Sequence, residues 1–286
     1  MIPNRNYRML HFRYFTFLLA CLLCPIAATA VQVEPVGSKI TIGGSGGTLA
    51  TMQILADAFK KTQPNVDVKI VPSLGSGGGM RALLAGAIDI AVLSRPVQES
   101  ERTQAVIDTP YTRTPLVFAT ATHMNVSNIS TSRLVSIYTD NLKKWPDGRP
   151  IRIVLRPEND ADTIHIKSWS SAMNDAVKLA EGRQGMIVAL TDLTAANGLE
   201  SIPGALGPTT LAQIISEQRA LRPLALDGNT PSLKSMADGT YPHSKTFRMV
   251  SLPKVNPLAL QFVAFLRSNE GQQILEKNGQ LALPRN

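Results

Sequence analysis

The chain has 286 residues, of which 44% are hydrophobic and 17% charged, with 29 Lys and Arg residues against 21 Asp and Glu residues. This composition excludes a disordered, collagen-like or disulfide-stapled protein and is typical of one large or two ordinary globular domains. The net charge of +8 is spread along the chain without a Lys/Arg run, so we expect no nucleic-acid partner.

The first thirty residues have the pattern of a secretory signal peptide. Three arginines precede an apolar stretch at 14–24 that is short for a bilayer span, and Ala28-Thr29-Ala30 supplies a cleavage site of small residues. We therefore expect export to the periplasm and a mature chain from residue 31, without thiols because both cysteines lie in the signal. A lipid on Cys21 is the alternative, since residues 18–21 are similar to a bacterial lipobox.

Strands and helices are predicted to alternate in the first part of the mature chain. Short strands are predicted at 39–42, 66–71 and 89–93. Helices are predicted between them, from the spacing of apolar residues at 49–59 and 80–85. A glycine-rich loop precedes each helix, at 43–47 and 74–79. Successive strand–loop–helix units indicate an α/β fold with a parallel sheet, whose ligands bind at the carboxyl ends of the strands.

The rest of the chain continues the alternation. Further strands are predicted at 114–121, 151–155, 186–190, 224–226 and 246–250. Further helices are predicted at 133–138, 258–266 and 272–277. Because the chain has no tandem repeat and no low-complexity linker, two lobes would be joined by crossing strands and not by a flexible tether.

The two glycine-rich loops predict an anion site. Glycines let the backbone approach a ligand closely, and the helix that follows each loop offers unpaired N–H groups and the positive end of its dipole. Neither loop has the Gly-Lys-Ser/Thr of a phosphate loop or the spacing of a dinucleotide fingerprint, so we expect no nucleotide. The alternative is that these glycines only form turns.

A strand-end arginine and two aspartates are further candidates. Arg156 follows the predicted strand at 151–155, where a guanidinium can hold an oxyanion through two hydrogen bonds, unless it is merely solvated. Asp160 and Asp162 come next. They either cap the following helix or accept hydrogen bonds from the ligand.

One motif suggests an enzyme. Gly43-Gly44-Ser45-Gly46-Gly47 fits the nucleophile elbow of hydrolases and would need one of His123, His165 or His243 as its partner. Ser45 lies only about fifteen residues after the cleavage site, before a hydrolase sheet is complete, so we expect no enzyme. The histidines lack metal-ligand spacing, and no metal or other cofactor is expected.

The glycine loops and the segment after the third predicted strand resemble the phosphate-binding proteins of bacterial ABC importers. The matching stretches are at 42–48, 75–79, 86–90, 94–96, 203–207, 224–227 and 237–242. The resemblance implies the two-lobed type II periplasmic binding protein fold, with 31–116 and 244–286 in lobe 1 and 117–243 in lobe 2. It also implies a periplasmic solute-binding protein, expected to be a monomer, that serves an inner-membrane ABC permease.

The same resemblance implies a set of ligand contacts: Thr48, Leu49, Ser76 with the neighbouring Gly77, Ser94 and Arg156. Two departures from the family are visible. Ser94 stands where the family usually has an aspartate, and Asp160-Ala161-Asp162 stands where it presents Ser-Gly-Thr. Carboxylates that face the cleft should repel a dianion. The ligand is therefore phosphate or a similar small oxyanion, or a different small polar solute, and a sensing or scaffold role is a further alternative.

Overall fold

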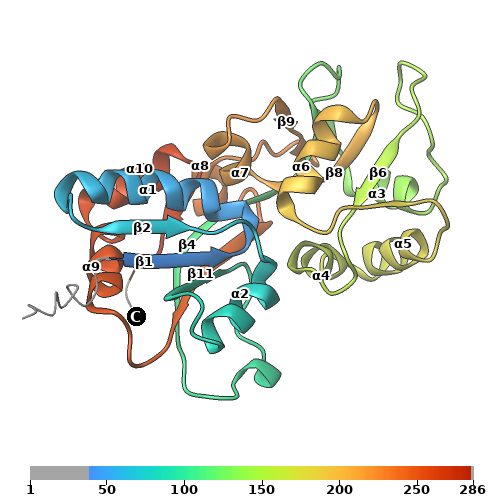
Figure 1. The fold of residues 1–286 in the computed structure, drawn as a ribbon. Helices are drawn as coiled ribbons and strands as arrows, with labels where there is room; N and C mark the ends of the chain where they lie inside the picture. The colour runs from blue at the N-terminus through green and yellow to red at the C-terminus, as the bar shows by residue number, and fades with distance from the viewer. Residues whose placement is uncertain (1–38, 285–286) are drawn as a thin grey trace, which may run out of the picture. The chain divides into compact units, whose positions relative to one another are not determined.

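The computed structural model describes residues 39–284, which Figure 1 colours by position in the chain. The predicted signal peptide, with both cysteines and the cleavage site, lies outside the described residues. Within 39–284, no helix is long and apolar enough to cross a membrane.

The two predicted strand–loop–helix units are present at the start of this range. Their elements are β1 (Lys39–Gly44), α1 (Leu49–Thr62), β2 (Asp67–Ile70), α2 (Gly75–Leu84) and β3 (Ile90–Leu93). A 3-10 turn, Gly46–Thr48, leads into α1. The prediction is wrong at the start of α2, because residues 75–79, expected as a loop, form the first turns of the helix.

Gly79 of α2 allows the helix to pack closely on β1. A Cβ atom at Gly79 would lie 2.8 Å from the Cα of Gly44, closer than side chains tolerate. The spacing of apolar residues reveals only the part of a helix that buries side chains, and a turn of glycines buries none. The loop prediction at 74–79 therefore failed because the glycine-rich first turns of α2 carry no apolar pattern.

The sheet runs in the order β2-β1-β3-β11-β4-β8-β6-β7. The strands not yet given in this order are β4 (Ile107–Ala121), β6 (Arg152–Leu155), β7 (Ile187–Val188), β8 (Ala205–Thr210) and β11 (Ser244–Ser251). The strands at each end pair in parallel, whereas β11 and β4 are antiparallel to their neighbours. The predicted α/β class with parallel strands is thus confirmed.

Strand β4 belongs to both halves of the sheet. It pairs with β11 as far as Pro115 and with β8 from Leu116 onward. The remaining short strands are β9 (Leu221–Pro223) and β12 (Leu281–Ala282), which pair with β4, and β5 (Asn128–Ile129) and β10 (Ala225–Leu226), which pair with each other.

Eight further helices cover the sheet and its connections. They are α3 (Thr131–Tyr138), α4 (Ala161–Lys167), α5 (Ser171–Glu181), α6 (Asp192–Ser201), α7 (Leu211–Ser216), α8 (Leu233–Ala237), α9 (Pro257–Leu266) and α10 (Asn269–Lys277). Each begins after a Ser, Thr, Asp or Asn whose side chain accepts a hydrogen bond from a backbone N–H of the first turn. By contrast, α1, α2 and the 3-10 turn have no such cap.

The helices around β1, β2 and β3 lie on two faces of the sheet. Ile90 and Val92 of β3 pack in one cluster with residues of α1, α9 and α10, whereas Ala91 and Leu93 pack in another with Met80 of α2. Alternate residues of a strand point to opposite faces, so α2 covers the face opposite to α1 (Figure 1).

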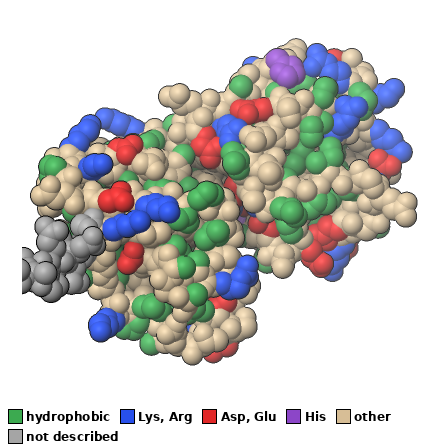
Figure 2. Space-filling view, in the orientation of Figure 1, with side chains coloured by type: hydrophobic (Ala, Val, Ile, Leu, Met, Phe, Trp, Pro, Cys, Tyr) green, Lys and Arg blue, Asp and Glu red, His purple; other side chains and the backbone are tan. Residues whose placement is uncertain are grey.

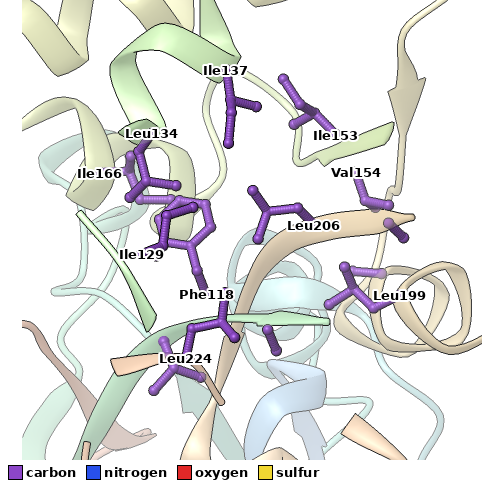
Figure 3. Packing of buried hydrophobic residues seen from close by; sticks show 14 of the residues in the cluster. Phe118, Ile129, Leu134, Ile137, Ile153, Val154, Ile166, Leu199, Leu206 and Leu224 are labelled. Carbon is purple, nitrogen blue, oxygen red and sulfur yellow. The ribbon is translucent and has the colours of Figure 1, made fainter. Parts of the chain in front are cut away.

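Buried apolar residues divide the chain near residues 116 and 243. One cluster contains residues from Leu116 to Tyr241, and Figure 3 shows members from α3, β6 and β8 gathered around Phe118. The other two clusters combine the first and last parts of the described chain, with Ala212 as the one member from between. On the face in Figure 2, basic and acidic side chains are interspersed and not gathered by sign.

Candidate ligand-binding site

A cavity of about 340 Å³ lies beyond the carboxyl ends of the strands. Ser45 follows β1, Ser94 follows β3 and Pro157 lies just beyond β6, and all three line the cavity. The rest of the lining is Gly75, Ser76, Gly77, Gly78, Arg81, Arg95, Gln98, Glu101, Asn159, Asp160, Ala161, Leu190 and Asp192. Ligands of open α/β sheets bind at this edge, so we take this cavity as the candidate site.

One wall of the cavity is the N-terminal turn of α2. No side chain caps this helix, so its first backbone N–H groups are available to a ligand. The Ser76 hydroxyl lies 3.1 Å from the Ser94 hydroxyl and accepts a hydrogen bond of 3.1 Å from the Ser94 backbone N–H. Arg81 also lines this wall. Hydroxyls, backbone donors and a cation together form a surface that suits an anion.

Arg95 on the same wall is paired with an acid. Its guanidinium makes two hydrogen bonds to Glu101, of 2.6 and 2.8 Å. Burial alone would raise the pKa of Glu101, but the hydrogen bond and charge of Arg95 hold that pKa below its ordinary value. The pair therefore stays ionised near neutral pH.

Arg156 lies behind the opposite wall. Its side chain is only 3% exposed, and its Nη1 donates to the carbonyl of Ala189 at 3.0 Å. Its Nη2 lies 2.9 Å from an oxygen of Asp160 and 3.6 Å from an oxygen of Asp192. The guanidinium therefore does not line the cavity itself but contacts two carboxylates that do, those of Asp160 and Asp192.

Asp160 both caps a helix and lines the cavity. One of its oxygens accepts a hydrogen bond from the backbone N–H of Asp162 at 2.9 Å and so caps α4, which confirms the capping prediction for Asp160. Its side chain also lines the cavity. The two roles that the sequence left open for Asp160 are therefore compatible.

Asp162 instead forms a buried ion pair with Lys245 of β11. Lys245 also lies 4.0 Å from Asp192. Burial alone would lower the pKa of Lys245, but the carboxylates of Asp162 and Asp192 raise it above its ordinary value. Lys245 therefore remains a cation inside the protein.

Asp192, the first residue of α6, is the carboxylate that joins these groups. Its carboxylate lies against the first glycine loop: a Cβ atom at Gly46 would lie 3.0 Å from one of its oxygens, and a Cβ atom at Gly47 would lie 3.7 Å from the other. Burial would raise the pKa of Asp192, but Lys245, Arg156 and the backbone N–H groups of Gly46 and Gly47 hold it below its ordinary value. Asp192 thus places a negative charge on the first glycine loop.

The predicted contacts are placed as follows. Ser76, Gly77, Ser94 and Asp160 line the cavity, and Arg156 touches two of its carboxylates, as described above. The lining contains neither Thr48, Leu49 nor Asp162. The Thr48 hydroxyl instead lies 2.8 Å from the Tyr111 hydroxyl.

Among charged residues, sequence reasoning missed Arg81, Arg95, Glu101 and Asp192 of the lining and Lys245, which lies behind it. Asp192 follows β7 much as Ser94 follows β3, and this strand-end position was the signal that could have found it. Lys245 had no such signal, because it lies inside a strand. Within residues 39–284, no group of three or more His, Cys, Asp or Glu side chains could hold a metal ion.

His243, which lies outside the cavity, should make the free energy of unfolding depend on pH. The ring of His243 stacks on Trp169 with 3.8 Å between centroids. Burial and the neighbouring His165 lower the pKa of His243 to about 4, whereas an unfolded histidine titrates near 6.5. The unfolded state therefore binds more protons between these values, and the free energy of unfolding should fall as pH drops from about 6.5 to 4.

We expect His243→Phe to reduce this pH dependence, because phenylalanine keeps a stacking ring that cannot be protonated. Urea denaturation between pH 4 and 7 measures the effect. His123→Gln is the matched control, since His123 is exposed. An equally steep fall in stability for His243→Phe and for the unchanged protein would contradict the prediction.

Comparisons with known proteins agree with this architecture. A family model described as a PBP superfamily domain matches residues 29–270. The phosphate-binding protein PstS of Bacillus subtilis (strain 168) is 24% identical over 246 residues, which cover 84% of this chain and 79% of that protein.

Two solved structures share the fold. One is a substrate-binding protein assigned to a phosphate ABC transporter of Clostridium perfringens, solved with bound phosphate. It has a TM-score of 0.73 and 19% identity, covering 86% of this chain and 100% of that one. The other, an ABC-type phosphate transport receptor from Vibrio cholerae, has a TM-score of 0.61 and 20% identity, covering 86% of this chain and 100% of that one.

Proposed function

The chain belongs to the PBP superfamily, and on that basis we propose that it is the solute-binding protein of an ABC importer that binds phosphate or a similar small oxyanion in the cavity. The names of its relatives support this proposal, since PstS proteins of two bacteria match most of the chain. The binding is reversible and changes no covalent bond.

The observation that carries the proposal is the uncapped N-terminus of α2. Side chains cap all eight helices from α3 to α10, but α2 has no cap, and its first turn lines the cavity. An oxyanion there would accept hydrogen bonds from the free N–H groups and from Ser76, and Arg81 would add positive charge.

The carboxylates on the opposite wall limit which anion fits. Ionised Asp160 and Asp192 can only accept hydrogen bonds. Hydrogen phosphate has an O–H to donate to such an acceptor, whereas sulfate near neutral pH has none. We therefore propose that the site prefers phosphate to sulfate.

The remaining parts of the proposal concern the cell and the lobes. The chain would be exported with cleavage of the signal peptide at 1–30, remain a monomer in the periplasm and deliver its solute to an inner-membrane permease. Lobe 1 would comprise 31–116 and 244–286 and lobe 2 would comprise 117–243. The division of the buried clusters near 116 and 243 and the continuity of β4 across both halves support these limits.

Calorimetric titration with phosphate and with sulfate near pH 7 tests the ligand. The protein is first unfolded and refolded, which removes any solute that copurified with it. We expect heat from phosphate and affinity for sulfate that is weaker by about tenfold or more, the scale of one unsatisfied hydrogen bond to a charged group. Comparable binding of both anions would contradict the role of the carboxylates.

Absence of heat from both anions would contradict the oxyanion proposal and favour a small solute with amino or hydroxyl groups, for which Asp160 and Asp192 are suitable acceptors.

Small-angle scattering at saturating phosphate tests the division into lobes. Lobes that close on a ligand reduce the radius of gyration, so an unchanged radius would count against them.

A further inference from the structure

The first glycine loop already contacts an anionic group of the protein itself, the carboxylate of Asp192. The loop leads through the Gly46–Thr48 turn into α1, and neither has a capping side chain of its own. The carboxylate of Asp192 from α6 lies against the backbone of Gly46 and Gly47, and a Cβ atom at Gly47 would lie 3.7 Å from one of its oxygens. A Cβ atom at Gly46 would lie 3.0 Å from an Asp192 oxygen, so the glycine is what admits the carboxylate this closely.

Asp192 is not needed to cap its own helix. The N-terminus of α6 is closed by a capping box, in which Thr191 and Thr194 exchange hydrogen bonds between side chain and backbone. The Asp192 carboxylate instead reaches other elements of the fold. It contacts the glycine loop, Arg156 beyond β6 and Lys245 of β11.

The charges around Asp192 leave no cation for a second anion. Arg156 and Lys245 are buried, and three carboxylates surround them, those of Asp160, Asp162 and Asp192. An oxyanion that approached the Gly46 and Gly47 donors would meet Asp192 in the same place. It would bind there only by displacing that carboxylate, at the cost of separating buried opposite charges.

We propose that Asp192 is a specificity-determining residue, an internal carboxylate that occupies the first glycine loop and confines the solute's oxyanion to the N-terminus of α2. This inference rests on the proposed function of the cavity. Its consequence is that the protein binds small oxyanions more weakly than its two glycine loops would permit. Removing the carboxylate frees donors at Gly46 and Gly47 and leaves Arg156 and Lys245 with one acid fewer.

The test is phosphate and sulfate titration of the refolded full-length mature protein and of Asp192→Asn. Asparagine keeps the size of the side chain but carries no charge, and its amide can donate to an anion. We expect Asp192→Asn to bind phosphate about tenfold or more tightly than the unchanged protein, with a larger gain for sulfate, which suffers the greater repulsion. Asp175→Asn is the matched control, because Asp175 is an exposed acid on α5.

Circular dichroism and thermal unfolding establish that each variant is folded. Asp192→Ser is a second variant, whose shorter, uncharged side chain leaves the Gly46 and Gly47 donors open. Phosphate affinity that is unchanged or weaker in both folded Asp192 variants would overturn the inference and leave the proposed function standing. Lack of phosphate and sulfate binding in all the proteins would instead overturn the proposed function. Binding that appears only when Asp192 is replaced supports the inference.

Discussion

Lys245→Met should lower the free energy of unfolding by about 3–5 kcal/mol, the cost of leaving a buried charge without its partner. The Lys245 side chain is 6% exposed and pairs with Asp162, whose side chain is 3% exposed. Methionine fills a similar volume but provides no charge, so Asp162 must then be protonated or remain buried as an uncompensated anion. Urea denaturation at pH 7 measures the loss.

A second substitution identifies the cause of this loss. Lys245→Met combined with Asp162→Asn removes both charges, and we expect it to recover much of the lost stability, because neutral partners avoid the unpaired charge. Lys234→Met is the control, since the pair of Lys234 and Asp238 is exposed and should contribute at most about 1 kcal/mol. If the Lys245→Met protein were as stable as this control, the ion pair between Lys245 and Asp162 would contribute nothing to the free energy of unfolding.

The alternation of elements was predictable because it depends on local patterns. The spacing of Leu49, Met52 and Leu55 identifies α1, and all three pack around the buried cluster beneath it. Helix α5 gives a weaker signal, because two of its four buried residues are alanines, Ala176 and Ala180. Small residues bury little apolar area, so the helix depends on tertiary contacts that the sequence alone does not reveal.

Part of the site was predictable from local features of the sequence. Arg156 was predicted because it follows a strand end, and a carboxyl edge is a place where ligands bind. Ser94 was predicted from the resemblance to phosphate-binding proteins; Ser94 lines the cavity, and Arg156 lies behind it. The buried ion pair behind the cavity could not be predicted from the sequence. Lys245 lies within β11 and meets Asp162 only after the chain folds, so no spacing in the sequence links the two.

The same contacts change the meaning of Arg156. From the sequence alone, it is an arginine that can grip an oxyanion directly. In the structure its Nη2 is already close to Asp160 and Asp192, so its positive charge offsets carboxylates that would otherwise repel the solute. We therefore expect Arg156 to affect binding by offsetting the charges of Asp160 and Asp192 and not by contacting the anion.

Arg156→Ala is accordingly expected to weaken phosphate binding by about 2–5 kcal/mol, the scale for removing one partner of a buried charge pair. Calorimetric titration measures the loss, with the folded fraction of each variant determined by denaturation. Arg222→Ala is the matched control, because Arg222 donates to the backbone carbonyls of Thr122 and Met124 and does not line the cavity. Equal phosphate affinity in the two variants would contradict the prediction.

The double variant Arg156→Ala with Asp192→Asn separates the two ways in which Arg156 can act. If the arginine works by offsetting the Asp192 charge, removing that charge makes the arginine less necessary. The double variant should then bind phosphate more tightly than the two single effects predict when added, since residues in contact are coupled. If the arginine instead grips the anion directly, its loss costs as much without Asp192 as with it, and the two effects add.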